Sequence, residues 1–405
     1  MAKKLTKREK NKIDKLAVKH WKVTLVLLLI LSSLFVVAYF MGWLDKFLKK
    51  EPILSTAGGY STTVDTLNDL KVNFLDVGQG DCIIIELPDG KNMIIDSGEN
   101  KEVVKDEIED FTTKNKIDTF DYVILTHQDS DHAGNMGWVI DNYTCNFIFR
   151  PNNYSSHKDS SSLPDDFNTK TDGGYESSTK IYSKFMVSAY NEKCTVEIFN
   201  KDSDFSNEII YGGNSYKYNF DFLTPTADRN KISYSDPNDY SPIMTLEYGG
   251  KKIMFTGDAE KKNIEEYIEA YGDEINIDVL KVGHHGSRTS TTDEFLQMID
   301  PEYAVIQCGI DNSYGHPHKE ALSSILSYEE GVKTYRNDTN GMITISLSVA
   351  GQLAFDMERG DCSNNDVDGN GVDVDGEIEI TQNVIIKINL KRFEIFDDTK
   401  RKLIV

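Results

Sequence analysis

Three apolar stretches of this chain are each followed by histidine or aspartate side chains. The stretches at residues 120–125 (FDYVIL), 251–255 (KKIMF) and 276–282 (NIDVLKV) are followed by THQDSDH, TGD and GHH. Short apolar runs rich in β-branched residues are typical of buried strands. A rigid sheet presents polar side chains at its strand ends. The pattern therefore constrains the chain to a sheet that gathers these groups into one site.

The surrounding sequence indicates a mixed α and β fold. Residues 71–98 contain three short β-branched runs, which Gly-Gln-Gly-Asp and Pro-Asp-Gly-Lys turn signals separate. A helix-like segment follows, and residues 248–260 (YGGKKIMFTGDAE) have the pattern of a hairpin. Alternating segments of this kind predict sheets that are covered by helices.

The histidines are concentrated at the strand ends. The chain holds eight of them, at positions 20, 127, 132, 157, 284, 285, 316 and 318. Six of the eight follow the strand-like runs at 120–125, 276–282 and 301–310 (PEYAVIQCGI), beside Asp129, Asp131 or Asn312. Imidazole and carboxylate groups at this density suit one or two divalent cations, which lower the pKa of a bound water toward neutrality. We therefore predict a metal centre.

A long uncharged segment lies near the N-terminus. Residues 23–44 (VTLVLLLILSSLFVVAYFMGWL) contain no charged side chain and are long enough to cross roughly 30 Å of hydrocarbon as a helix. Residues 1–22 hold eight lysines and Arg8 against Glu9 and Asp14, so the positive-inside rule places them in the cytoplasm. The apolar run exceeds the core of a signal peptide and lacks a small-residue cleavage site. We expect an uncleaved single-pass anchor in the cell membrane, with the rest of the chain extracellular.

The chain beyond this anchor is strongly acidic. The whole chain has a formal net charge of −22, although its first residues are basic. A broad electrostatic surface for nucleic acid needs lysine and arginine, so the acidity argues against such a surface. The five cysteines are odd in number and include no C-x-x-C pair, so they do not form a disulfide framework.

Six motifs together carry a family resemblance. In chain order they are FLDVGQGD, IIDSG, THQDSDHAGN, FTGD, HHGS and YGHP. They resemble the metallo-β-lactamase superfamily and, within it, the extracellular hydrolase domain of ComEC-type competence proteins. The resemblance covers residues 71 to 355 and implies an α/β fold, a four-layered αββα sandwich with the site at one edge, between the ends of two sheets.

Composition and resemblance divide the chain into five segments. We expect a basic cytoplasmic segment at 1–22, a transmembrane anchor at 23–44, a linker at 45–70, the hydrolase domain at 71–358 and an acidic, partly β-like tail at 359–405.

The tail contains a calcium-like motif. Residues 366–377 (DVDGNGVDVDGE) fit the EF-hand loop pattern, with oxygen ligands at Asp366, Asp368, Asn370 and Glu377. The neighbouring segments resemble strands and coil rather than the paired helices of an EF-hand. Calcium binding and a solvated acidic linker therefore both stay open.

The resemblance implies two divalent cations and a set of ligands. These ligands are His127 and Asp129 for the first metal, Asp131 and His132 for the second, and Asp258 as a bridge between them. Either His284 or His285 completes the second metal, and the sequence does not distinguish them.

The resemblance also implies residues around the metals. The implied substrate-binding residues are Asp76, Gln79, Asp81, Asn312 and Tyr314. Asp96 would brace the ligand loop from behind the ligands. His316 would serve near the substrate as a proton donor or oxyanion stabiliser, and Asp129 and Asp131 complete the expected catalytic residues.

Two departures from the superfamily pattern bear on the metal. Asp129 replaces the second histidine of the H-x-H-x-D-H pattern, as in the competence branch. No histidine lies between His157 and His284, so the usual third ligand of the first metal is missing. A first metal held in this way would be weakly bound, and zinc and manganese both fit it.

These features predict a membrane-anchored, extracellular metal-dependent hydrolase. The leading hypothesis is a phosphodiesterase or nuclease that uses a metal-bound hydroxide, with DNA or another phosphodiester as its substrate. One alternative is a surface esterase that removes phosphorylcholine from cell-wall polymers. Another is a non-catalytic binding module that the metal stabilises.

Overall fold

The computed structural model describes residues 60–360, apart from residues 169–173, 230, 273–274 and 329–331. These residues belong to one compact unit of the chain. The expected basic segment, the expected anchor at 23–44 and the calcium-like motif at 366–377 lie outside the described residues. Within the described part, no helix is long and apolar enough to cross a membrane.

The first large sheet has eight strands. Their order is β1 (Tyr60–Thr63), β10 (Phe205–Tyr211), β11 (Asn214–Phe222), β12 (Met244–Tyr248), β13 (Lys251–Phe255), β14 (Val279–Lys281), β15 (Tyr303–Ile306) and β16 (Lys333–Arg336). The predicted hairpin is β12 and β13, which pair antiparallel. The strands from β13 to β16 are parallel, so their carboxyl ends meet at one edge.

The position of β1 corrects one boundary. The sequence predicts a linker at residues 45–70, but Tyr60–Thr63 pairs in parallel with β10 at the edge of the first sheet. The small, polar side chains of this edge strand stay partly or fully exposed at Ser61, Thr62 and Thr63. They therefore give no apolar alternation that would mark a strand.

The second large sheet also has eight strands. Their order is β18 (Leu353–Met357), β17 (Ile343–Leu347), β2 (Leu70–Phe74), β3 (Ile83–Glu86), β4 (Asn92–Ile95), β5 (Thr119–Ile124), β6 (Thr144–Arg150) and β9 (Thr195–Ile198). The strands β2, β3 and β4 are the three runs predicted between residues 71 and 98. A separate small sheet pairs β7 (Asn153–Ser155) with β8 (Tyr175–Ser177).

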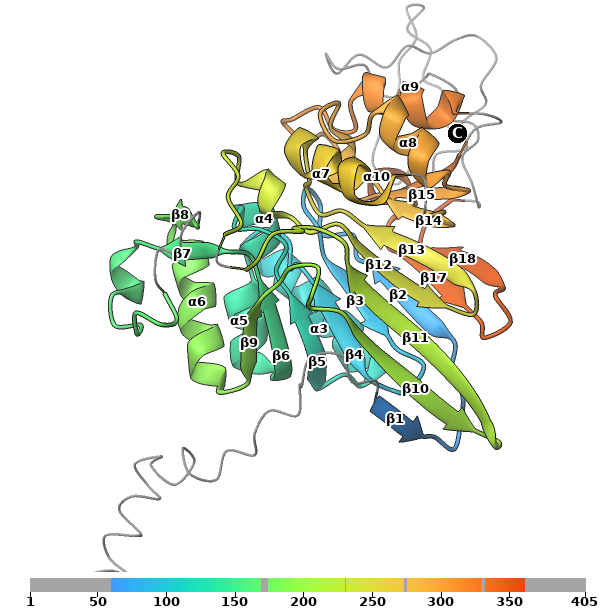
Figure 1. Ribbon diagram of the computed structural model, residues 1–405, viewed down its shortest axis with the longest axis horizontal. Helices are drawn as coiled ribbons and strands as arrows, with labels where there is room; N and C mark the ends of the chain where they lie inside the picture. The colour runs from blue at the N-terminus through green and yellow to red at the C-terminus, as the bar shows by residue number, and fades with distance from the viewer. Residues whose placement is uncertain (1–59, 169–173, 230, 273–274, 329–331, 361–405) are drawn as a thin grey trace, which may run out of the picture. The chain divides into compact units, whose positions relative to one another are not determined.

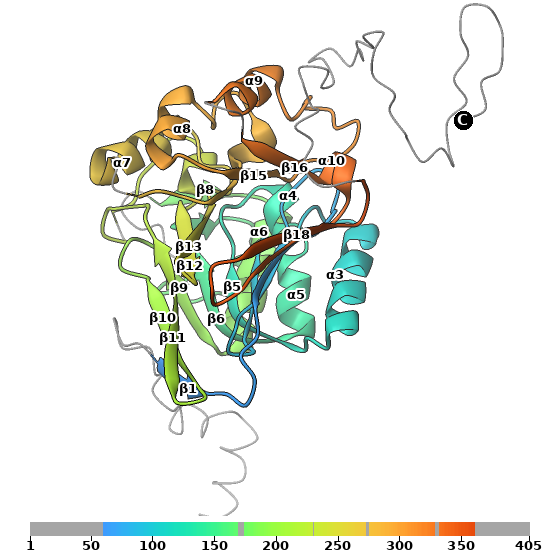
Figure 2. The same ribbon diagram turned by 90° about the vertical axis from the view of Figure 1, so that its right-hand side faces the viewer.

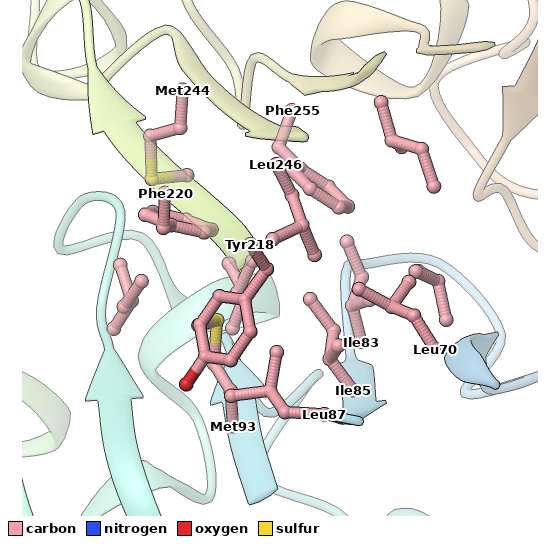
Figure 3. Packing of buried hydrophobic residues seen from close by; sticks show 14 of the residues in the cluster. Leu70, Ile83, Ile85, Leu87, Met93, Tyr218, Phe220, Met244, Leu246 and Phe255 are labelled. Atoms are coloured by element: carbon pink, nitrogen blue, oxygen red, sulfur yellow. The ribbon is translucent and has the colours of Figure 1, made fainter. Parts of the chain in front are cut away.

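The main core lies between the two large sheets. Tyr218, Phe220 and Leu246 of the first sheet face Ile83 and Ile85 of the second (Figure 3). In β3 the intervening residue Ile84 points to the opposite face and joins a second apolar cluster. This strand is therefore buried on both faces, which accounts for its continuous apolar run.

Helices cover the outer face of each sheet (Figures 1 and 2). The helices over the second sheet are α3 (Glu102–Asn115), α5 (Met136–Asn142) and α6 (Lys180–Glu192). Those over the first sheet are α7 (Lys261–Tyr271), α8 (Asp293–Ile299) and α9 (Lys319–Ser327). Short helical segments are α4 (Ser130–Ala133), α10 (Asn337–Asn340), η1 (Lys158–Ser160), η2 (Asn238–Tyr240) and η3 (Gly283–Gly286). The layers thus run helix, sheet, sheet, helix, as predicted.

Candidate metal centre

Two buried histidines from different sheets meet at the carboxyl ends of their strands. His132 lies in α4, shortly after β5, and His285 lies in η3, shortly after β14. Their Nε2 atoms are 3.3 Å apart. Asp258, which follows β13, places its Oδ2 3.2 Å from Nε2 of His132 and 3.4 Å from Nε2 of His285. Three potential ligand atoms therefore converge on one point.

The hydrogen-bond partner of Nδ1 determines which nitrogen of each ring carries the proton. Nδ1 of His132 lies 2.7 Å from Oδ2 of Asp96, and Nδ1 of His285 lies 2.9 Å from the carbonyl oxygen of Gln307. An ionised carboxylate and a carbonyl only accept hydrogen bonds, so both Nδ1 atoms carry a proton. In the neutral rings the Nε2 lone pairs then face each other and Asp258. Such an arrangement favours a positive charge between the rings, and imidazoles oriented in this way are usual metal ligands.

Asp131 completes this group of ligands. Its Oδ2 lies 3.4 Å from Nε2 of His285. Burial alone would raise the pKa of Asp131, but the hydrogen bond from His285 and the charge of His132 hold that pKa far below its ordinary value. Two ligands of one zinc ion at about 2.0–2.2 Å are themselves roughly 3.0–4.2 Å apart. The four contacts that join His132, His285, Asp131 and Asp258 fall within that range, so these residues fit a divalent cation.

His127 and Asp129 also lie close to Asp258. Nε2 of His127 is 3.9 Å from Oδ2 of Asp129 and 4.0 Å from Oδ2 of Asp258. Burial lowers the pKa of His127 to about 4, so the ring is neutral at physiological pH. Among the described residues this buried Nε2 has no hydrogen-bond partner, and neither has Oδ1 of Asp258. Buried polar atoms without a partner are costly, and both atoms are suited to ligate a metal.

Comparison with known proteins agrees with this geometry. Residues 75–310 match the family described as the Metallo-beta-lactamase superfamily. The chain belongs to this superfamily. ComE operon protein 3 of Bacillus subtilis (strain 168) is 27% identical over 288 residues, which cover 67% of this chain and 32% of that protein. Recombination protein 2 of Haemophilus influenzae is 27% identical over 266 residues, or 65% of this chain and 27% of its own length.

A third relative is similar over a shorter stretch. Competence protein ComA of Neisseria gonorrhoeae is 34% identical over 135 residues, which cover 33% of this chain and 19% of that protein. These relatives are ComEC-type competence proteins, so the predicted resemblance is confirmed. The chain spans about a third or less of the length of each of the three.

The structure separates the two histidines that the sequence leaves unresolved. His285 is buried and belongs to the group of ligands that also contains His132, Asp131 and Asp258. The side chain of His284 is partly exposed, and its Nε2 lies 3.7 Å from Oδ2 of Asp258. Of the two predicted candidates, His285 therefore fits the second metal.

Asp81 does not lie where the sequence predicts it. We expected this residue to line the substrate mouth, but its side chain is buried and forms an ion pair with Lys281. Its carboxylate approaches the rings at their Nδ1 edges, 3.3 Å from His285 and 3.9 Å from His132. Asp258 contacts the Nε2 atoms on the opposite edges of the same rings. Asp81 therefore lies on the side of the two histidines that faces away from the metal position. It braces His285 instead of contacting substrate.

The other expected substrate residues lie in two adjoining loops. The backbone N–H of Gly309 donates to Oε1 of Gln79 at 3.3 Å, which turns the Gln79 amide nitrogen toward Nδ1 of His316 at 3.4 Å. Nδ1 then accepts, so the proton of a neutral His316 ring sits on Nε2. Burial, together with the charges of His285 and His284, lowers the pKa of His316 to about 3. His316 is therefore a neutral N–H donor in this protein.

The remaining mouth residues differ in their contacts. The side chain of Asn312 accepts from the backbone N–H of His316 at 2.9 Å and donates to its carbonyl oxygen, so Asn312 holds the His316 loop. Tyr314 is 63% exposed and stacks on the His316 ring. Asp76 accepts from Arg359 at 2.6 Å. Asn312 thus acts through His316, whereas Tyr314 is free to meet a substrate.

Three supporting residues were not singled out from the sequence. Ser241 places its hydroxyl 3.1 Å from Nδ1 of His127 and accepts from the backbone N–H of Asp258 at 3.1 Å. Lys281 neutralises Asp81, and a lysine inside the apolar run DVLKV was its only signal. Glu260 hydrogen-bonds to His284, which lies 24 residues later in the chain, so no local sequence pattern indicates this contact.

Proposed function

We propose that this chain is a membrane-anchored, extracellular, metal-dependent phosphodiesterase or nuclease. The observation that carries the proposal is the convergence of His132, His285 and Asp258 with Asp131 at the joint edge of the two sheets. Bound divalent cations would supply a Lewis acid and would lower the pKa of a water molecule.

The protein groups around the metals support hydrolysis. The side chain of Asp129 is 43% exposed, so it is accessible to water and substrate. Partial burial raises the pKa of Asp129 although the charge of His132 opposes the rise, and this net rise favours a role as proton acceptor. The neutral His316 ring offers an N–H group to negative charge that develops on a substrate oxygen.

Two further features support a phosphodiester and a membrane location. Asp129 gives the first site an oxygen ligand in place of an imidazole, which suits a hard cation such as manganese. The relatives carry competence and recombination in their names. The uncharged segment at 23–44 and the basic residues before it support a single anchor with an extracellular hydrolase domain.

A second candidate is an esterase that releases phosphorylcholine. The net charge of −22 disfavours a long polyanion, whereas a quaternary ammonium group would be attracted by the carboxylates of Asp129 and Asp131. The exposed ring of Tyr314 could contact such a cation through its face.

A panel of substrates tests the proposal. The purified full chain, supplied with manganese or zinc, is assayed on single-stranded DNA, plasmid DNA, bis(p-nitrophenyl) phosphate and p-nitrophenyl phosphorylcholine. Cleavage of DNA or the diester supports the leading function, and cleavage of the choline ester alone supports the second. If none of the four substrates is cleaved, both candidate functions are overturned.

A further inference from the structure

The turn that carries the two adjacent histidines has an unusual backbone. His284 and His285 both adopt left-handed conformations, with φ of 47° and 53°. Non-glycine residues seldom take such conformations, and their strain is frequently associated with functional sites. The turn places the buried His285 ring beside His132 and the partly exposed His284 ring within 3.7 Å of Oδ2 of Asp258. The two neighbours thus place their Nε2 atoms near the same oxygen of Asp258.

His284 has the surroundings of a metal ligand. Its Nε2 lies 3.7 Å from Oδ2 of Asp258. Its Nδ1 lies 2.8 Å from Oε1 of Glu260, and the hydroxyl of Thr289 donates to that same oxygen at 2.8 Å. A histidine that binds a metal usually donates its other ring N–H to a carboxylate. The pair of His132 with Asp96 shows this arrangement on the second metal's side, and the pair of His284 with Glu260 repeats it.

The first metal lacks a ligand that His284 could supply. His127, Asp129 and Asp258 are the protein groups that fit this metal, and no histidine precedes His284 as far back as His157. Nε2 of His127 and Nε2 of His284 lie 4.0 Å and 3.7 Å from the shared oxygen of Asp258. Both separations fall within the roughly 3.0–4.2 Å expected for two ligands of one cation.

We propose that His284 is a ligand of the first metal, beside His127, Asp129 and Asp258, and that Glu260 positions the His284 ring. The inference rests on the proposed function as a metal-dependent hydrolase. It gives the Gly-His-His-Gly turn one ligand for each metal, His284 for the first and His285 for the second. The alternative is a surface ion pair between His284 and Glu260 that has no part in metal binding.

Metal binding by the full chain tests this assignment. Asparagine tolerates the left-handed backbone, so His284→Asn removes the imidazole with little change in the turn. His157→Asn is the matched control, because His157 precedes η1 and the contacts of its Nδ1 atom are local, to the backbone N–H and the carboxylate of Asp159. Manganese binding is measured by isothermal titration, and the coupled two-manganese signal is followed by electron paramagnetic resonance.

We expect wild type and His157→Asn to bind two manganese ions and to give the coupled signal. His284→Asn should keep one ion and lose the coupled signal, and Glu260→Gln should weaken the first site about 10- to 100-fold. Unchanged binding of two ions by His284→Asn would overturn the assignment while leaving the hydrolase proposal intact. No manganese or zinc binding by wild type would instead contradict the proposed function. Thermal unfolding of each metal-free variant checks that the variant folds. If His284→Asn does not fold, Glu260→Gln tests the same assignment.

Discussion

Nε2 of His132 lies 3.3 Å from Nε2 of His285, while the Nδ1 atom of each ring is engaged by a different acceptor. Burial lowers the pKa of both rings, but the surrounding carboxylates, of which Asp258 acts most strongly, together outweigh burial and raise the pKa of each ring above its ordinary value. In the metal-free protein, we therefore expect a proton between the two Nε2 atoms, in the place that a metal ion would take.

The first prediction is that metal binding releases protons. A metal ligand must be a neutral imidazole, so the cation displaces the proton held by the pair. Because the pKa values are raised, affinity should fall as pH falls through them. Isothermal titration of the metal-free chain in two buffers with different ionisation enthalpies measures the release. An affinity that does not change between pH 8 and pH 6 would contradict this account.

The second prediction concerns Gly80, which passes close to the metal loop. A Cβ atom at this position would meet the carbonyl oxygen of Asp131 at 2.3 Å, and its φ is +130°. Gly80→Ala should displace Asp131, destabilise the fold by about 1–3 kcal/mol and weaken metal binding.

Gly78→Ala is its matched control. Its φ of +76° is also positive, but a Cβ atom there has no neighbour within 4 Å among the described residues. Its cost should come from the backbone alone, about 1–2 kcal/mol, and metal affinity should stay as in wild type. Equal metal affinities of the two variants, measured by titration, would contradict the close approach of Gly80 to Asp131.

Much of the fold follows from local patterns in the sequence. The buried runs of β3 and β13 and the turn signals between strands predict the sandwich, because alternation and turn chemistry act over a few residues. The edge strand β1 could not be predicted in this way. Its pairing with β10 joins residues 60–63 to residues 207–210, and its polar side chains carry no periodicity.

The ligands were easier to predict than the residues that support them. His127, His132 and Asp258 follow apolar strands in the chain, so a local pattern marks them. Asp81 was misplaced because its contact with Lys281 spans two different sheets, and a GQGD turn gives no sign of burial. The choice between His284 and His285 depends on the left-handed backbone of one turn, which the sequence does not specify.

The third prediction concerns the buried pair of Lys281 and Asp81. Lys281→Met would leave the Asp81 carboxylate without its cation behind the ligands, so we expect a loss of about 3–5 kcal/mol of stability. The double variant with Asp81→Asn should recover part of this loss, because no buried charge remains unpaired. Urea unfolding of the metal-free chain measures both.

Lys251→Met provides the control for this pair. Lys251 binds Asp278 at the sheet surface, where both side chains are partly exposed. The expected loss is about 0–1 kcal/mol. Equal losses of unfolding free energy for Lys281→Met and Lys251→Met would show that the buried ion pair contributes no more to stability than the exposed one.

The fourth prediction concerns His316. Because its pKa is lowered to about 3, the ring stays neutral from pH 5 upward and does not govern the acid side of a pH–rate profile. His316→Gln should lower kcat about 100-fold or more, with the acid limb at the same pH as in wild type. Loss of that limb in the variant would show that protonation of His316 controls activity.

The most direct test of the central claim follows hydrolysis of bis(p-nitrophenyl) phosphate by the full chain after removal of divalent metal with a chelator. We predict no turnover without metal, recovery on addition of manganese or zinc, and no recovery for Asp131→Ala. Turnover by the metal-free chain, or wild-type turnover by Asp131→Ala, would contradict a metal-dependent phosphodiesterase.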